Sequence, residues 1–135
     1  MKICGVELKA NTIVFSVVEV MNNEVNYLDT KIKKIALEDD ENQTSLKEFK
    51  DSIDTFISKN NIEKIVIKKR AKKGNFAGGA ITFKIEALIQ LNLSCEVLFV
   101  SSQTITKYIK NNEIIFPKSL NKYQEQAYLS SLILV

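Results

Sequence analysis

The first 35 residues constrain the fold most, because they hold three strand patterns separated only by short turns. Segments Ile3–Leu8 and Thr12–Val20 are rich in β-branched residues, which favour extended structure. Val25–Ile35 has a weaker alternation of apolar and polar residues and is expected to form the third strand. Consecutive strands with short connections pair antiparallel. The sequence therefore begins with a three-stranded antiparallel meander.

The rest of the chain alternates helical and strand patterns. A helix capped by Thr44 or Ser45 is expected to run to Lys59, because its apolar residues are spaced by 3, 4, 3 and 1 positions. Lys64–Lys68 has a continuous apolar middle, which is typical of a buried parallel strand. The remaining expected elements are a helix over Ala80–Leu91, a strand over Cys95–Val100, a helix capped by Ser101 or Ser102, and a last helix from Asn121.

This order of elements predicts an α/β fold. A meander followed by right-handed βα crossovers gives one mixed sheet with helices on both faces. We expect five strands, with the first strand internal and the fourth parallel beside it, which is the ribonuclease H-like arrangement. A chain of 135 residues is long enough for one such domain, over residues 1–135. No apolar run approaches the roughly 18 residues of a membrane span, so we expect a cytoplasmic protein without membrane contact.

The absence of histidine excludes several kinds of site. With no histidine in the sequence, Ser-His-Asp and Cys-His catalysis and imidazole-ligated zinc are excluded. The two cysteines, Cys4 and Cys95, are too few for a zinc site built from thiolates alone. Both lie in apolar strand segments and are interpreted as core residues of a protein in a reducing compartment.

Charge is distributed unevenly along the chain. The formal net charge is +3, yet the segment Glu38–Glu63 is acidic and is interpreted as a solvated helix face. Lys64–Lys84 contains seven basic residues and no acid. Five of these cations fall within Lys68–Lys73, where they repel one another. Such a cluster favours an anionic partner, although it is also compatible with a solvated loop.

The loop after the fourth strand adds glycines to this basic segment. Gly78 and Gly79 precede a helix, and backbone N–H groups at a helix N-terminus bind anions. The spacing matches neither a Walker A loop nor a dinucleotide fingerprint. The alternative is a tight turn that needs glycine at positive φ. Phe76 is interpreted either as a core residue or as a ring that stacks on nucleic acid.

Two segments resemble a known family. They are ICGVELK, at Ile3–Lys9, and the stretch Lys73–Gly79 followed by Thr82–Glu86. Together they resemble the bacterial domain-of-unknown-function family 3010, over essentially the whole chain. The family looks like a member of the ribonuclease H-like superfamily, similar in style to RuvC-type junction resolvases. This resemblance implies a nuclease site in which carboxylates hold Mg or Mn.

Carried over residue by residue, the resemblance implies three candidate carboxylates. Glu7 matches the first acid of the superfamily, on the central strand, and Glu125 matches an acid that opens the last helix. Glu86, on the second helix, is a further candidate. The acid usual near the end of strand four is replaced by the cations of Lys68–Arg70.

Each carboxylate also has an ordinary interpretation. Glu7 is equally suited to be a charge partner of Lys9, Lys69 or Arg70. Glu125 is then an acid favoured by the helix dipole in a first turn. Glu86 is then a solvent-facing helix residue.

Three functions follow from these observations. The leading hypothesis is a ribonuclease H-like domain that binds nucleic acid or a phosphorylated ligand. The first alternative is an active metal-dependent nuclease that uses Glu7 and Glu125. The second is a non-catalytic module whose basic loop binds an acidic protein. The apolar C-terminus, Leu132–Val135, is expected to pack on the sheet or against a second copy of the chain, and a homodimer is favoured. The expected phosphate-binding residues are Lys68, Lys69, Arg70, Lys72, Lys73, Gly78, Gly79 and Lys84.

Overall fold

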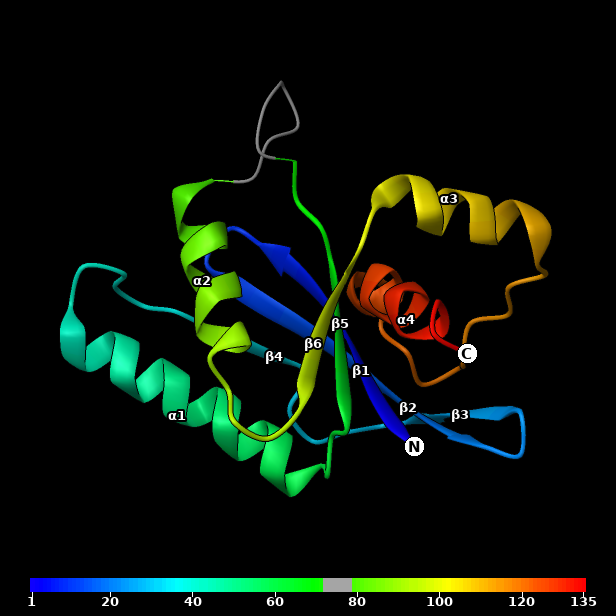
Figure 1. Ribbon diagram of the computed structural model, residues 1–135, viewed down its shortest axis with the longest axis horizontal. Coiled ribbons are helices and arrows are strands. Elements are labelled where there is room, and N and C mark those ends of the chain that lie inside the picture. Colours follow the sequence, from blue (N-terminus) through cyan, green and yellow to red (C-terminus); the bar gives the residue numbers. More distant parts are fainter. Residues whose placement is uncertain (72–78) are drawn as a thin grey trace.

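The computed structural model describes residues 1–71 and 79–135. A mixed sheet has the strand order β3-β2-β1-β5-β6, and β4 pairs with β2 off this path (Figure 1). The strands are β1 (Lys2–Lys9), β2 (Thr12–Met21), β3 (Glu24–Leu28), β4 (Lys34–Ala36), β5 (Lys64–Lys68) and β6 (Glu96–Val100). The helices are α1 (Gln43–Lys59), α2 (Ala80–Gln90), α3 (Ser102–Asn111) and α4 (Glu125–Leu132), the last preceded by a 3₁₀ turn, η1 (Lys122–Gln124).

Strand β1 is internal, as the sequence predicts. It pairs antiparallel with β2 along its whole length, from Lys2 opposite Glu19 to Lys9 opposite Thr12. On its other side it pairs parallel with β5, which in turn pairs parallel with β6. The carboxyl ends of β1, β5 and β6 therefore meet at one edge of the sheet, the edge at which open α/β sheets bind ligands.

The predicted third strand is wrong in its extent. The segment Val25–Ile35 is divided into β3 and β4, which pair with different halves of β2. Between them the chain leaves the sheet in a turn, where the Thr30 N–H donates to the Leu28 carbonyl oxygen. The Lys33 Nζ also lies 3.0 Å from Asp29 Oδ1 in this turn. These local interactions interrupt the ladder, and within the described residues the sheet has six strands instead of the expected five.

The helix starts differ slightly from the expected positions. Helix α1 is capped by Asn42, whose side chain accepts a hydrogen bond of 2.9 Å from the Ser45 N–H. The Ser45 hydroxyl accepts instead from the Asp39 N–H. Ser101 caps α3, as predicted, by accepting from the Thr104 N–H. An Asn side chain therefore takes the capping position assigned to a hydroxyl residue in α1.

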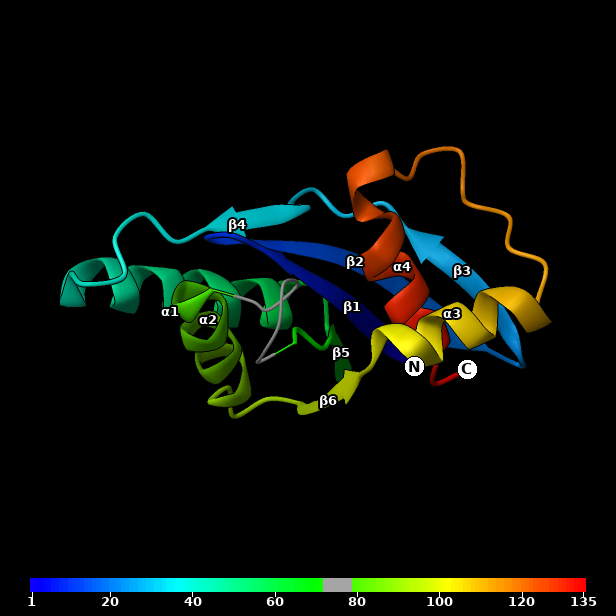
Figure 2. The same cartoon turned by 90° about the horizontal axis from the view of Figure 1, so that it is seen from above.

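Helices cover both faces of the sheet. Figures 1 and 2 show α1 and α2 on one face and α3 and α4 on the other. Side chains of β1 alternate between the two layers. Cys4, Val6 and Leu8 pack with the α1 and α2 layer, whereas Ile3 packs with α4. Leu132, the last residue of α4, is buried in the core between α4 and the sheet, whereas Leu134 and Val135 are exposed.

Helix α4 lies unusually close to β1. A Cβ atom at Gly5 would be 1.8 Å from the carbonyl oxygen of Ala127 and 2.9 Å from the Ser131 nitrogen. The Ser130 and Ser131 hydroxyls donate back to carbonyls of their own helix, so they need no partner on the sheet. This close approach fixes α4 against the middle of β1. Among the described residues, no helix is long and apolar enough to cross a bilayer.

Burial should make the thiols of Cys4 and Cys95 unequal in reactivity, which chemical labelling can test. Loss of solvation, the largest cause, raises the pKa of the Cys4 thiol, which is 1% exposed, and burial also raises the pKa of half-buried Cys95. Because the thiolate is the reactive form, we expect Ellman's reagent to modify Cys95 slowly and Cys4 only in denaturant. Cys95→Ser should abolish labelling of the folded protein. Rapid reaction of both thiols without denaturant would contradict the buried position of Cys4.

Candidate nucleic-acid interface

Glu7, near the carboxyl end of β1, forms a buried ion pair. Its side chain is 7% exposed and lies on the α4 face of the sheet. Lys9 Nζ is 3.3 Å from Glu7 Oε1, and Lys68 Nζ is 3.6 Å from Glu7 Oε2. The prediction that Lys9 is a charge partner of Glu7 is confirmed. The second partner is Lys68, not Lys69 or Arg70, because Lys68 follows Ile67, the partner of Val6, and so lies beside Glu7 on the same face of the sheet.

Lys68 also connects β5 to α4. Its ammonium group donates a hydrogen bond of 3.0 Å to Gln126 Oε1, and its side chain is only 18% exposed. One amine thus lies between a carboxylate on β1 and an amide oxygen on α4. Lys68, predicted as a phosphate contact, is therefore mainly engaged inside the protein.

The described side chains do not fit a divalent metal site. Mg²⁺ and Mn²⁺ prefer several oxygen ligands, and a two-metal site needs several carboxylates. Both oxygens of Glu7 already lie within 4 Å of a lysine nitrogen. Within residues 1–71 and 79–135, no three Asp, Glu, Cys or His side chains are grouped so that they could hold a metal ion.

The three candidate carboxylates also lie on three different elements of the fold. Glu125 is the first residue of α4 and is half-buried. Glu86 lies on α2, across the sheet from α4 (Figure 2). The assignment of Glu7, Glu125 and Glu86 to catalysis stays a prediction, and we derive no step through a metal.

Gln124 is a site residue that the sequence interpretation missed. It is fully buried, and its Nε2 donates to the Phe15 carbonyl oxygen at 2.8 Å. Its Oε1 accepts from the Asn121 N–H at 3.1 Å, which completes a capping box at the start of η1. The spacing of Asn121 and Gln124 is the sequence signal of this motif. Gln124 and Gln126, on either side of Glu125, thus join this end of the chain to the sheet.

Two cations at the carboxyl edge have no acidic partner among the described residues. The Lys69 N–H donates to the Val100 carbonyl oxygen at 2.7 Å, which fixes the backbone while the side chain remains exposed. Arg70 is half-buried, and its Nε has no hydrogen-bond partner. In the part of the chain that the structure describes, no ion pair includes Lys69 or Arg70. These side chains are therefore available for an anion.

The other predicted phosphate contacts are less available for an anion than Lys69 and Arg70, or lie outside the described residues. Lys84 Nζ lies 3.8 Å from Asp40 Oδ2 and donates to the Asp40 carbonyl oxygen, so its charge is partly neutralised. Gly79 caps α2 with a φ of −75°, so it does not need the positive φ of a glycine turn. Lys72, Lys73 and Gly78, like Phe76, lie outside the described residues.

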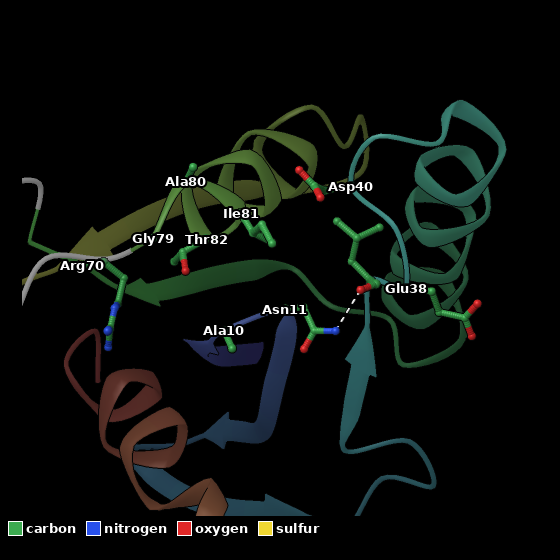
Figure 3. Close-up of a pocket in the computed structure, with 10 residues that line it drawn as sticks. Ala10, Asn11, Glu38, Asp40, Arg70, Gly79, Ala80, Ile81 and Thr82 are labelled. Atoms are coloured by element: carbon green, nitrogen blue, oxygen red, sulfur yellow. Dashed lines mark hydrogen bonds between the residues drawn. The ribbon is translucent and has the colours of Figure 1, made fainter.

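A cleft of ≈ 640 Å³ opens at the N-terminus of α2, with Arg70 on one side (Figure 3). Gly79 and Thr82 line the helix side of this cleft. The opposite wall contains Asn11, whose Nδ2 donates to the Leu37 carbonyl oxygen at 2.9 Å. The acids Glu38 and Asp40 also line the cleft. Its positive side is therefore limited to Arg70 and the start of α2.

Arg70 also lines a second, smaller cleft. Its volume is ≈ 290 Å³, and it is formed between α2 and the end of β6. Its lining residues are Lys69, Arg70, Phe83, Glu86, Gln90 and Phe99. Lys69 and Arg70 thus both line this cleft, and Arg70 lines the larger cleft as well.

Comparison with protein families gives one match. The sequence pattern of a family described as a protein of unknown function (DUF3010) matches residues 1–133. A search of the curated proteins finds no match.

Solved structures with a similar fold include junction resolvases. RuvC of Thermus thermophilus superimposes with a TM-score of 0.74 at 6% identity, covering 98% of this chain and 92% of RuvC. T. thermophilus RuvC in complex with a Holliday junction substrate gives a TM-score of 0.69, also at 6% identity, with the same coverage. The fowlpox virus resolvase with Holliday junction DNA gives a TM-score of 0.53 at 15% identity, covering 98% of this chain and 89% of the resolvase. At these identities the similarity establishes the ribonuclease H-like, RuvC-like fold and nothing about activity.

Proposed function

The chain belongs to the DUF3010 family and has a ribonuclease H-like fold, and from this premise we propose that it binds nucleic acid through the carboxyl edge of its sheet. The fold supports this proposal because two of the similar solved structures contain Holliday junction DNA. The position supports it as well, because ligands of open α/β sheets bind beyond the carboxyl ends of the parallel strands.

The observation that carries the proposal is the pair of unpartnered cations at this edge. Glu7 is neutralised by Lys9 and Lys68, so it does not offset the charge of Lys69 and Arg70. An uncompensated positive edge attracts phosphate groups and gains free energy by releasing their counterions. Arginine adds a planar fork of donors that matches phosphate oxygens.

We propose binding without metal-dependent hydrolysis. Hydrolysis by two metals needs carboxylates around a shared pair of ions. Here the central-strand carboxylate is occupied by ammonium groups, and the described side chains offer no cluster of carboxylates around it. Cytoplasmic location and homodimer formation stay predictions.

Salt dependence of binding tests the proposal. The double variant Lys69→Ala/Arg70→Ala should flatten the plot of log affinity against log salt by roughly 1.8 units on duplex DNA and roughly 1.4 units on single strands. These values assume that each side chain contacts one phosphate. The loss should be similar across sequences, because phosphate contacts position a protein without reading bases. Fluorescence anisotropy over a series of salt concentrations measures the slope.

The matched control is Lys47→Ala/Lys59→Ala. It also removes two cations that take part in no ion pair among the described residues, in this case from the exposed surface of α1. Both double variants reduce the net charge equally, so a non-specific charge effect would flatten both slopes alike. Equal slopes in the two variants, or no binding of wild-type protein to nucleic acid at low salt, would overturn the proposal. In the second case, binding to an acidic protein becomes the better explanation.

A further inference from the structure

We infer that the cleft between α2 and the end of β6 accepts an unstacked base of the bound strand, an inference that rests on the proposed function. The cleft is lined by two aromatic rings and is adjacent to the two unpaired cations. Proteins that bind single-stranded or distorted nucleic acid combine these two features, with cations along the backbone and rings beneath the bases.

Phe99 and Phe83 supply the aromatic surface. Phe99 is 39% exposed near the carboxyl end of β6, the last strand of the sheet path. Phe83 is half-buried on α2. The ring pairs found within the described ranges involve other aromatic residues, so neither phenylalanine stacks on another described ring. An exposed ring beside unpaired cations is costly to leave in water and gains contact area from a base.

The helix presents one stripe of residues to this cleft. Phe83, Glu86 and Gln90 are separated by three and four positions, so they lie along one side of α2. Thr82, Ile85 and Ile89 are buried on the side that packs on the sheet. The cleft is therefore formed by residues that the core does not use.

Charge sets the orientation of a nucleotide in the cleft. Lys69 and Arg70 follow β5 at the carboxyl edge, where the phosphate backbone is proposed to run. The phosphate is thereby directed to the cations, and the base is directed between the rings.

The size of the cleft agrees with a single base. A volume of ≈ 290 Å³ is at the lower limit of the range of about 300–1,000 Å³ typical of ligand sites. Lys69 and Arg70 line it at the carboxyl edge, where the backbone of the strand is proposed to lie outside the cleft. A stacked duplex does not present a base in this way, because its bases are paired inside the helix.

An abasic strand separates base binding from phosphate binding. The experiment compares a fluorescein-labelled DNA single strand of mixed sequence with an abasic strand of equal length and charge. We expect the wild-type protein to bind the strand with bases more tightly. Phe99→Ala should reduce affinity for that strand by roughly 5- to 100-fold, the range of single stacking contacts, and leave affinity for the abasic strand unchanged. Phe83→Ala should act in the same direction.

Two variants serve as controls. Phe99→Leu keeps an apolar side chain but lacks an aromatic face, so it should also lose affinity for the strand with bases. Phe116→Ala removes a ring of similar exposure, 36%, that contacts Tyr128 in the α4 layer, and it should leave binding unchanged. Thermal denaturation confirms that each variant is folded. The salt slope should stay the same in the Phe99 variants, because no phosphate contact is removed.

The outcomes distinguish this inference from the proposed function. Equal binding of the two strands by wild-type protein, with a steep salt slope, would overturn the base site and leave the nucleic-acid interface standing. If Phe99→Ala lowered the affinity for the abasic strand as much as for the strand with bases, the base site would also be overturned. Failure of wild-type protein to bind either strand would overturn the proposed function, and the base site with it.

Discussion

Replacement of Gly5 by alanine should destabilise the protein strongly, because α4 leaves no room for a methyl group there. The new Cβ would lie 1.8 Å from the Ala127 carbonyl oxygen and 2.8 Å from its carbonyl carbon. These are backbone atoms of α4, so no side-chain rotation relieves the clash, and the helix itself must move off β1. Insertion of an extra group into a well-packed core typically costs about 1–3 kcal/mol of stability. Because backbone cannot rotate away, the cost here should be at or above the upper end of that range. We expect a loss of about 3 kcal/mol or more in the free energy of unfolding, measured by urea denaturation.

Ser16→Ala is the matched control for this prediction. Ser16 pairs with Gly5 across β1 and β2, and its buried Oγ has no hydrogen-bond partner. Removal of an unsatisfied hydroxyl relieves a desolvation cost, so the stability should be unchanged or slightly higher. A Gly5→Ala variant as stable as Ser16→Ala would contradict the close approach of α4 to β1.

The order of strands could be predicted because each strand has a strong local pattern. The β-branched segments of β1 and β2 and the apolar middle of β5 define the sheet, and only the short connections of the meander and the crossover rules are needed to arrange them. The division of Val25–Ile35 was not predictable in the same way. It depends on the turn at Asp29–Lys33 and on β2 being long enough to pair with two short strands.

The site could be predicted only in part, because its decisive contacts are distant in sequence. Alternation along β1 and β5 could place Glu7 and Lys68 on one face of the sheet. Lys68 is 58 positions from Gln126, however, and nothing local indicates that its ammonium group reaches that amide. The capping box of Asn121 and Gln124 does have a local signal, but the contact of Gln124 with Phe15 spans 109 positions. Long-range packing of α4 thus decides which predicted cations remain free.

Glu7→Gln provides the sharpest test of the buried ion pair. The substitution keeps the shape of the side chain but leaves the ammonium group of Lys68, which is 18% exposed, without its carboxylate. Removal of one partner of a fully buried pair costs about 3–5 kcal/mol, and partial exposure of Lys68 lowers this to about 2 kcal/mol. We expect that loss in urea denaturation. The double variant Glu7→Gln/Lys68→Gln should recover part of it, because no unpaired charge remains.

Lys9→Ala is the control for this pair. The effects of Glu7→Gln on cleavage and on the urea midpoint decide whether Glu7 is structural or catalytic. Lys9 is half exposed at its contact with Glu7, and exposed ion pairs contribute about 0–1 kcal/mol, so its loss should be small. If Glu7 instead served a metal-dependent nuclease, Glu7→Gln would abolish Mg²⁺- or Mn²⁺-dependent cleavage while the urea midpoint stayed unchanged. A lowered midpoint without any cleavage activity to lose supports the ion pair, because the carboxylate is then needed to compensate Lys68 beneath α4.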